Sequence, residues 1–85
     1  MATIVHADGS EEYLDDCSLA SLQSVVGGFI QIVSTVDGKL VVLDEEGKLK
    51  SKALNLRATE MLKGRISDTD YIVGDVVVAT TDEID

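Results

Sequence analysis

Residues 27–46 read GGFIQIVSTVDGKLVVLDEE, and this stretch predicts a β-hairpin. Residues 29–36 form one run rich in β-branched and aromatic side chains, and residues 39–43 form a second one. Asp37 and Gly38 separate the two runs, and both tolerate the positive φ values that a two-residue type I′ turn requires. We therefore expect two antiparallel strands that are joined by this tight turn.

A two-residue turn fixes which residues face one another across the hairpin. It would place Val36 opposite Lys39 and Val33 opposite Val42, and side chains would then alternate between the two faces of the sheet. One face would carry Phe29, Val33, Leu40 and Val42, and the other Ile30, Ile32, Val41 and Leu43. Because both faces are apolar, we expect the hairpin to lie centrally in a sheet that is covered on each side.

Further strands and two helices are predicted around this hairpin. Residues 3–7 and 11–14 favour a short N-terminal hairpin, and residues 71–80 favour a last strand with apolar side chains on both faces. Apolar residues recur at helical spacing in 18–26 and again in 54–63. We expect an extended connector before the second helix.

Residues that start and stop helices flank both helical segments. Ser18 and Asn55 are suited to accept a hydrogen bond from an unpaired backbone N–H, so they are the predicted N-caps. Gly27 and Gly64 follow the last helical turns and are suited to the left-handed conformation that ends a helix. Gly74 interrupts the last strand and indicates a bulge or a close approach of another backbone.

The predicted fold class is α+β, with a mostly antiparallel twisted sheet of about five strands and two short helices in the order ββαββαβ. The chain of 85 residues is expected to form one domain, 1–85, with a short acidic tail at 81–85. The helices are expected to cover one face of the sheet. Sheet curvature or a second subunit would close the other face, which makes a homo-oligomer the expected state.

Charge is distributed unevenly along the chain. The formal net charge is −9, which disfavours direct binding to nucleic acid. Every Lys and Arg lies between residues 39 and 65, whereas the segments before and after contain Asp and Glu but no Lys or Arg. The basic side chains are Lys39, Lys48, Lys50, Lys52, Arg57, Lys63 and Arg65. Two interpretations stay open for them: solvated charge around a loop and a helix, or a patch for an anionic ligand.

Residues with catalytic or metal-binding chemistry are scarce. With one cysteine, Cys17, and one histidine, His6, the chain offers no intrachain disulfide, no cysteine–histidine metal site and no supported catalytic triad. We expect no enzyme activity, no catalytic residue, no metal and no cofactor, and we interpret His6 as a satisfied polar group. An unpaired cysteine, no signal-peptide pattern and no membrane-length apolar run favour a cytoplasmic protein without membrane contact.

Four motifs in order carry a family resemblance. They are LQSVVGGFIQIV (22–33), DGKLVVLDEEGKL (37–49), NLRATEML (55–62) and IVGDVVV (72–78). Over roughly residues 19–79 the chain resembles a family of small uncharacterised proteins carried by phages, prophages and plasmids and catalogued as a domain of unknown function.

The chain departs from this family pattern at two positions. Gln31 stands where the family often has glutamate, and Leu54 stands where it often has proline. The resemblance implies an accessory protein of a mobile element, which would counter host defences by binding, in the host cytosol if it is encoded by a phage. It supplies no catalytic residues.

Three functional hypotheses remain. The first is a non-enzymatic binding protein that sequesters an anionic nucleotide-type ligand. Its expected ligand-binding residues are Asn55, Arg57, Thr59, Lys63 and Arg65, with Arg57 holding a phosphate and Asn55 contacting a base or ribose. The second is an acidic protein inhibitor that imitates DNA and blocks a host nuclease or another defence protein. The third is a structural or assembly subunit without a ligand.

Overall fold

The computed structural model describes residues 2–84 and contains five strands and two α-helices, which confirms the predicted α+β class and the order ββαββαβ. Asp85, in the predicted acidic tail, lies outside the described residues. The elements are β1 (Ala2–Val5), β2 (Glu11–Leu14), α1 (Leu19–Val26), β3 (Ile30–Ser34), β4 (Leu40–Asp44), the 3₁₀ turn η1 (Gly47–Lys50), α2 (Leu56–Met61) and β5 (Val76–Ala79).

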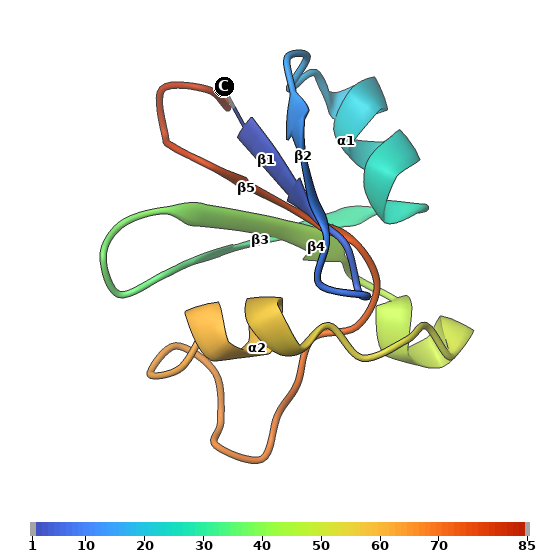
Figure 1. Ribbon diagram of the computed structural model, residues 1–85, viewed down its shortest axis with the longest axis vertical. Coiled ribbons are helices and arrows are strands. Elements are labelled where there is room, and N and C mark those ends of the chain that lie inside the picture. Colours follow the sequence, from blue (N-terminus) through green and yellow to red (C-terminus); the bar gives the residue numbers. More distant parts are fainter. Residues whose placement is uncertain (1, 85) are drawn as a thin grey trace.

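The strands form one antiparallel sheet in the order β2-β1-β5-β4-β3. The last strand in sequence, β5, therefore lies in the middle, between the two hairpins (Figure 1). The expectation of a central position for the whole β3–β4 hairpin was wrong for one strand, since β4 is internal whereas β3 is an edge. The predicted last strand also shortens, because residues 71–75 form irregular backbone before β5 begins.

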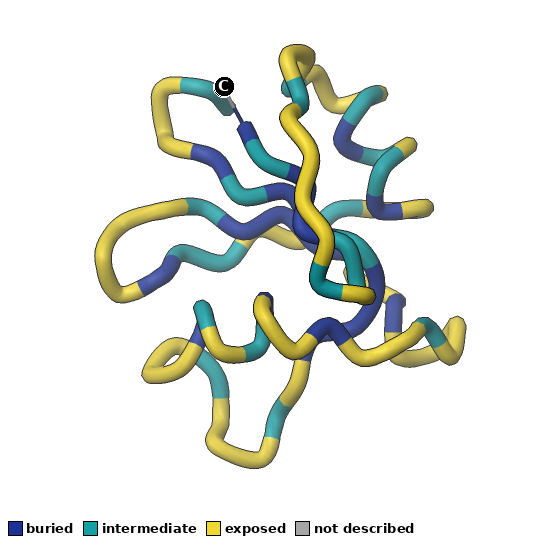
Figure 2. The backbone as a smooth tube through the Cα atoms, in the orientation of Figure 1, coloured by how far each residue is buried: buried dark blue, intermediate teal, exposed yellow. Residues whose placement is uncertain are grey.

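The helices cover opposite faces of this sheet, which corrects the expectation that both lie on one face (Figure 1). Leu22 and Val26 of α1 pack against one face, which the core residues Ala2, Ile4, Val42, Val77 and Ala79 complete. Ala58 and Leu62, from α2 and its end, pack against the other face with Val5, Val41, Leu43, Ile72 and Val76. Four strands, β1, β3, β4 and β5, thus contribute alternate side chains to two separate cores, whereas β2 contributes only Leu14, to the α1 side. The buried stretches meet in the middle of the molecule (Figure 2).

The hairpin turn differs from the predicted one by a residue. Thr35 donates its backbone N–H to Lys39 O at 2.8 Å, so the loop holds three residues, 36–38, and Gly38 at its end has a φ of 90°. Three-residue loops of this kind place glycine in the left-handed region. Val33 consequently faces Val41 rather than Val42.

This shift of one residue also corrects the predicted faces. Val33 now shares a face with Val41 and Leu43, while Ile30 lies on the α1 side with Val42.

The predicted N-caps Ser18 and Asn55 and the end of α1 at Gly27 are confirmed. The predicted end of the second helix is not, because α2 ends at Met61 with Leu62 as its C-cap, so Gly64 lies two residues beyond that cap. Ser18 Oγ accepts from Ser21 N at 3.3 Å, and Asn55 Oδ1 accepts from Ala58 N at 3.0 Å. Gly27 ends α1 with a φ of 85°. The predicted extended connector is different in the structure, because its first residues belong to the 3₁₀ turn η1.

Candidate functional site

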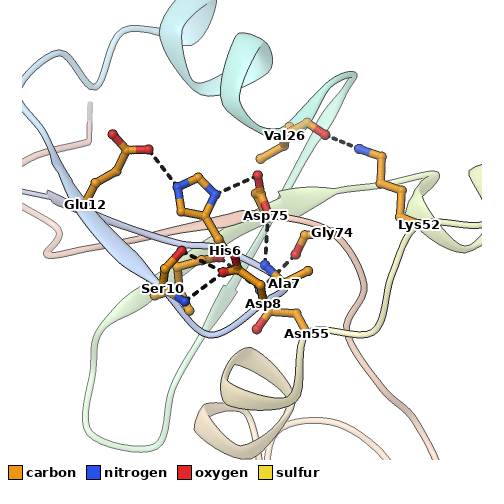
Figure 3. A network of polar contacts seen from close by, with 11 residues as sticks. His6, Ala7, Asp8, Ser10, Glu12, Val26, Lys52, Asn55, Gly74 and Asp75 are labelled. Carbon is orange, nitrogen blue, oxygen red and sulfur yellow. Dashed lines mark hydrogen bonds and ion pairs between the residues drawn. The ribbon is translucent and has the colours of Figure 1, made fainter.

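Asn55, the residue expected to contact a ligand base, is fully buried beneath α2. Its Nδ2 donates to Val5 O at 3.0 Å and to Gly74 O at 2.8 Å, while its Oδ1 caps α2 (Figure 3). The side chain thereby joins β1, the segment before β5 and the start of α2. These bonds engage both polar atoms of the amide within the fold.

Thr59 lies one turn further along α2 and is also engaged within the fold. Its hydroxyl donates to Asn55 O at 2.8 Å and accepts from Ile72 N at 2.8 Å. It therefore links the helix to the irregular segment that leads into β5.

The three predicted basic ligand residues are exposed and do not converge on one point. Arg57 pairs with Glu11 of β2, and Arg65 Nε donates to Ser34 O at 3.1 Å at the end of β3. Lys63 lines a pocket of about 250 Å³ together with Thr59 and residues of the 66–70 segment. The assignment of these residues to a ligand site stays a prediction.

The lysines before α2 hold the end of α1. Lys50 and Lys52 place their Nζ atoms 2.9 and 2.8 Å from Asp44 Oδ2. Lys50 also donates to Gly27 O at 3.0 Å, and Lys52 donates to Val26 O. Both lysines thus satisfy carbonyls at the C-terminus of α1, where the helix dipole favours positive charge.

Asp44 is the acceptor at the centre of this cluster and is only 4% exposed. Burial alone would raise the pKa of its carboxyl. The hydrogen bonds from Lys52, Lys50 and the Glu46 N–H outweigh that effect and lower the pKa to about 2. The Asp44 carboxyl therefore stays ionised, and the cluster of Asp44, Lys50 and Lys52 is structural.

A cavity of about 170 Å³ opens beyond this cluster, on the α2 side of the sheet. Its apolar lining comes from β3, β4, η1 and the 66–73 segment, namely Val33, Leu43, Leu49, Ile66, Ile72 and Val73. Its polar lining comprises Gln31, Asp44, Glu45, Glu46, Lys48, Asp70 and Tyr71. Carboxylates outnumber ammonium groups among these lining side chains, so the lining carries a negative formal charge.

Lys48 and Tyr71 form the polar wall of the cavity. The Lys48 ammonium lies 4.4 Å from the centre of the Tyr71 ring and pairs with Asp70. This ion pair and the backbone N–H of Tyr71 lower the pKa of the Asp70 carboxyl. The Lys48 ammonium thus makes a cation–π contact with the face of the Tyr71 ring.

His6 directly follows β1 and bridges two carboxylates, those of Glu12 and Asp75 (Figure 3). Its Nδ1 is 2.8 Å from Asp75 Oδ2, and its Nε2 is 2.7 Å from Glu12 Oε1. These hydrogen bonds, first that to Asp75, raise the pKa of the imidazole. His6 ties β1, β2 and the start of β5 together, as its interpretation as a satisfied polar group predicts.

The Cys17 thiol is also poorly suited to nucleophilic chemistry. Burial, followed by the nearby Glu83 carboxylate, raises its pKa. Among residues 2–84, no three His, Cys, Asp or Glu side chains gather in a way that could hold a metal ion. No helix in that range is long and apolar enough to cross a membrane.

The sequence profile of one family, described as Domain of unknown function (DUF3846), matches residues 1–85. The chain belongs to the DUF3846 family. No curated protein and no solved structure matches it significantly. This DUF3846 protein therefore has a family assignment that covers the whole chain and says nothing of an activity, so its chemistry has to be inferred from its own residues.

Sequence reasoning missed the residues that line the cavity. Gln31, Lys48 and Tyr71 are far apart in the chain and meet only because β4 passes between β3 and the segment that leads into β5. One signal was present, since the acids at 44–46 directly follow the apolar run at 40–43. Acids in that position lie where a sheet ends and a cavity can open.

Proposed function

We propose that this DUF3846 protein acts without catalysis, by stoichiometric binding of a basic protein surface at its acidic cavity. The observation that carries the proposal is the placement of the bases. Five of the seven basic side chains are held by acceptors of the chain itself: Lys48 by Asp70, Lys50 and Lys52 by Asp44, Arg57 by Glu11, and Arg65 by Ser34 O. Little positive charge is left to attract an anion.

This placement favours the acidic inhibitor over the nucleotide-binding protein. A phosphate needs donors that converge on it. Arg57 and Arg65 are engaged on separate strands, and Lys63 alone of the expected bases has no acceptor among residues 2–84. The excess of acids that gives the net charge of −9 stays at the surface. Such a surface attracts positively charged partners and accelerates their association at low salt.

The cavity fits the side chain of an arginine or lysine. The aliphatic part of such a side chain would lie on Val33 and Ile66, and its charged end would reach Glu45 and Glu46 at the rim. Glu45 and Glu46 are both exposed and have no base as a partner among the described residues. They are therefore the residues that we assign to partner binding.

Proteins that bind DNA present basic surfaces of this kind. If the gene is carried by a phage or plasmid, as the resemblance implies, the partner is a nuclease or another DNA-binding defence protein in the host cytosol. Binding would then block the surface that the host protein uses for DNA. The acidic protein would compete with DNA for that surface.

Fluorescence anisotropy with a labelled octa-arginine peptide tests the charge preference. We expect saturable binding that weakens steeply between 50 and 300 mM NaCl as screening increases (roughly a tenfold change or more). A labelled octa-glutamate peptide and a cyclic dinucleotide should not bind. Binding of the dinucleotide without binding of octa-arginine would refute the proposal and favour the nucleotide hypothesis.

Matched variants test the place of binding. Glu45→Gln with Glu46→Gln removes two charges at the cavity rim, whereas Asp15→Asn with Asp82→Asn removes two exposed charges elsewhere. We expect the rim pair to weaken octa-arginine binding about tenfold and the control pair to weaken it less than threefold. Equal losses of affinity in the two pairs would show that the peptide responds to the net charge of the protein and does not bind at the cavity.

A further inference from the structure

The edge strand β3 (Ile30–Ser34) presents unpaired backbone groups along its outer side. Thr35 N–H donates to Lys39 O, and Glu45 N–H donates to Phe29 O at 2.9 Å, so the odd-numbered residues of this strand bond to β4. In an antiparallel pair the alternate residues point their N–H and C=O groups away. The backbone groups of Ile30, Ile32 and Ser34 therefore face outward.

One of these outward groups is already satisfied. Arg65 Nε donates to Ser34 O at 3.1 Å, which closes the edge at the turn end of β3. The N–H and C=O groups of Ile30 and Ile32 remain as two complete donor–acceptor pairs. They define a segment of three residues, Ile30-Gln31-Ile32, which another strand can join.

The side chains around this segment are apolar and exposed. Phe29 is 66% exposed, Ile32 44% and Val36 72%. Residues 17–36 contain no charged side chain and the chain contains no proline, so β3 lacks the features that usually protect a sheet edge. The opposite edge has this protection, because β2 carries exposed Glu11 and Glu12 (Figure 2).

We infer that a second copy of this chain covers the β3 edge by antiparallel pairing, with Ile30 of each copy opposite Ile32 of the other. The segment Ile-Gln-Ile reads the same in both directions, so a twofold axis through Gln31 lets each copy satisfy the other. This register uses the N–H and C=O groups of Ile30 and Ile32 in each copy and leaves the Arg65 bond to Ser34 O in place.

The palindromic Ile-Gln-Ile register favours a second copy as the occupant, and charge favours this edge as the place. Two chains of net charge −9 repel each other wherever their acids meet, and the β3 strands carry no charged side chain, so no carboxylates lie directly opposite each other across the paired strands. Pairing of this kind would extend the five-stranded sheet through both copies. It would also bury Phe29 and Ile32, which the single chain leaves in water.

The two-fold arrangement places both α2 helices on the same side of the extended sheet. Gln31 lies at the axis and also lines the acidic cavity, so the two cavities would open close together on that side. The dimer does not depend on the proposed partner, and its oligomeric state can be measured without any ligand.

Multi-angle light scattering of the full chain at increasing concentration tests the dimer. We expect the mass of two chains for the natural protein. Gln31→Lys should give the mass of one chain, because two like charges then lie directly opposite each other. Far-ultraviolet circular dichroism checks that this variant, exposed at its changed position, keeps its fold.

Disulfide trapping tests the register and does not depend on the folding of that variant. Opposite Cα atoms at a non-hydrogen-bonded position lie about 4.5 Å apart, within the range that a disulfide spans. In a Cys17→Ala background, Gln31→Cys should crosslink two chains under mild oxidation, and Tyr13→Cys on the opposite edge should not.

Three results would overturn the inference. A natural protein that stays monomeric at about 1 mM shows that no copy covers the edge. Crosslinking by Tyr13→Cys but not by Gln31→Cys places the contact at β2. A dimer that persists in Gln31→Lys and is not trapped by Gln31→Cys lies elsewhere on the surface.

Discussion

Replacing Asp44 by asparagine should make the stability of this protein much less sensitive to acid. The folded-state pKa of Asp44 is about 2, against an ordinary value of 3.8. A difference of nearly two pKa units, at 1.36 kcal/mol for each, corresponds to about 2 kcal/mol of stability. Because the pKa is depressed in the folded state, this contribution is complete above the unfolded value and is lost as pH falls from about 5 to 2.

Asp44→Asn keeps the shape of the side chain but removes the charge that Lys50 and Lys52 contact at 2.9 and 2.8 Å. We expect a loss of about 2 kcal/mol at pH 7, seen as a fall of one to two molar in the urea midpoint followed by circular dichroism. The difference between the two proteins should shrink to near zero at pH 2.

Asp82→Asn is the matched control, since it removes one carboxylate from an exposed turn. Its free energy of unfolding at pH 7 should stay within about 0.5 kcal/mol of that of the natural protein. A gap between natural protein and Asp44→Asn that is the same at pH 6 and at pH 2 would refute the reasoning, because it would show that Asp44 is not held ionised by its lysines.

Three further predictions concern single residues of the fold. Asn55→Ala removes three buried hydrogen bonds and leaves the backbone groups that made them without a hydrogen-bond partner. Urea unfolding should therefore show a loss of about 3 kcal/mol in the free energy of unfolding, and a loss below about 1 kcal/mol would contradict the role assigned to Asn55. The pKa of His6 is raised in the folded protein, so its stabilising effect is complete below pH 6.5 and is lost as pH rises through its folded-state pKa. NMR titration of this single imidazole should give a midpoint above pH 6.5. A midpoint at or below pH 6.5 would contradict the hydrogen bonds from His6 to Asp75 and Glu12. Gly74→Ala strains a backbone at a φ of 76° and pushes an added Cβ to within 2.8 Å of Lys52 Cδ, whereas Gly9→Ala meets open space at a φ of 93°. Gly74→Ala should therefore lower the thermal midpoint more than Gly9→Ala does, and equal shifts would show that the Lys52 contact is unimportant.

The local parts of the fold follow from the sequence. Ser18 and Asn55 cap their helices and Gly27 ends the first one, because capping depends on residues within one helical turn. The register of the central hairpin does not follow in this way. Asp37-Gly38 fits both a two-residue loop and the end of a three-residue loop, and the buried Thr35 hydroxyl decides between them by bonding to Asp37 and to Lys39 N–H.

The candidate site is less predictable because it depends on contacts between distant segments. The basic segment was correctly seen as a local feature, yet its charges point to Asp44, Glu11 and Asp70, whose positions depend on the arrangement of the strands. An asparagine such as Asn55 can contact a ligand or lie in a core, and its residue type does not distinguish the two roles. Its buried hydrogen bonds to Val5 O of β1 and to Gly74 O depend on how the strands are arranged, which the sequence alone does not show.

The central place of β5 has a consequence for how the chain folds as it is made. The β1–β2 hairpin and the β3–β4 hairpin are each local and can form within microseconds, but the sheet joins them through Val76–Ala79. A ribosome that has released only the first 70 residues would therefore hold two hairpins with exposed inner edges. Until β5 emerges and inserts, each of these edges is open to pairing with another nascent chain.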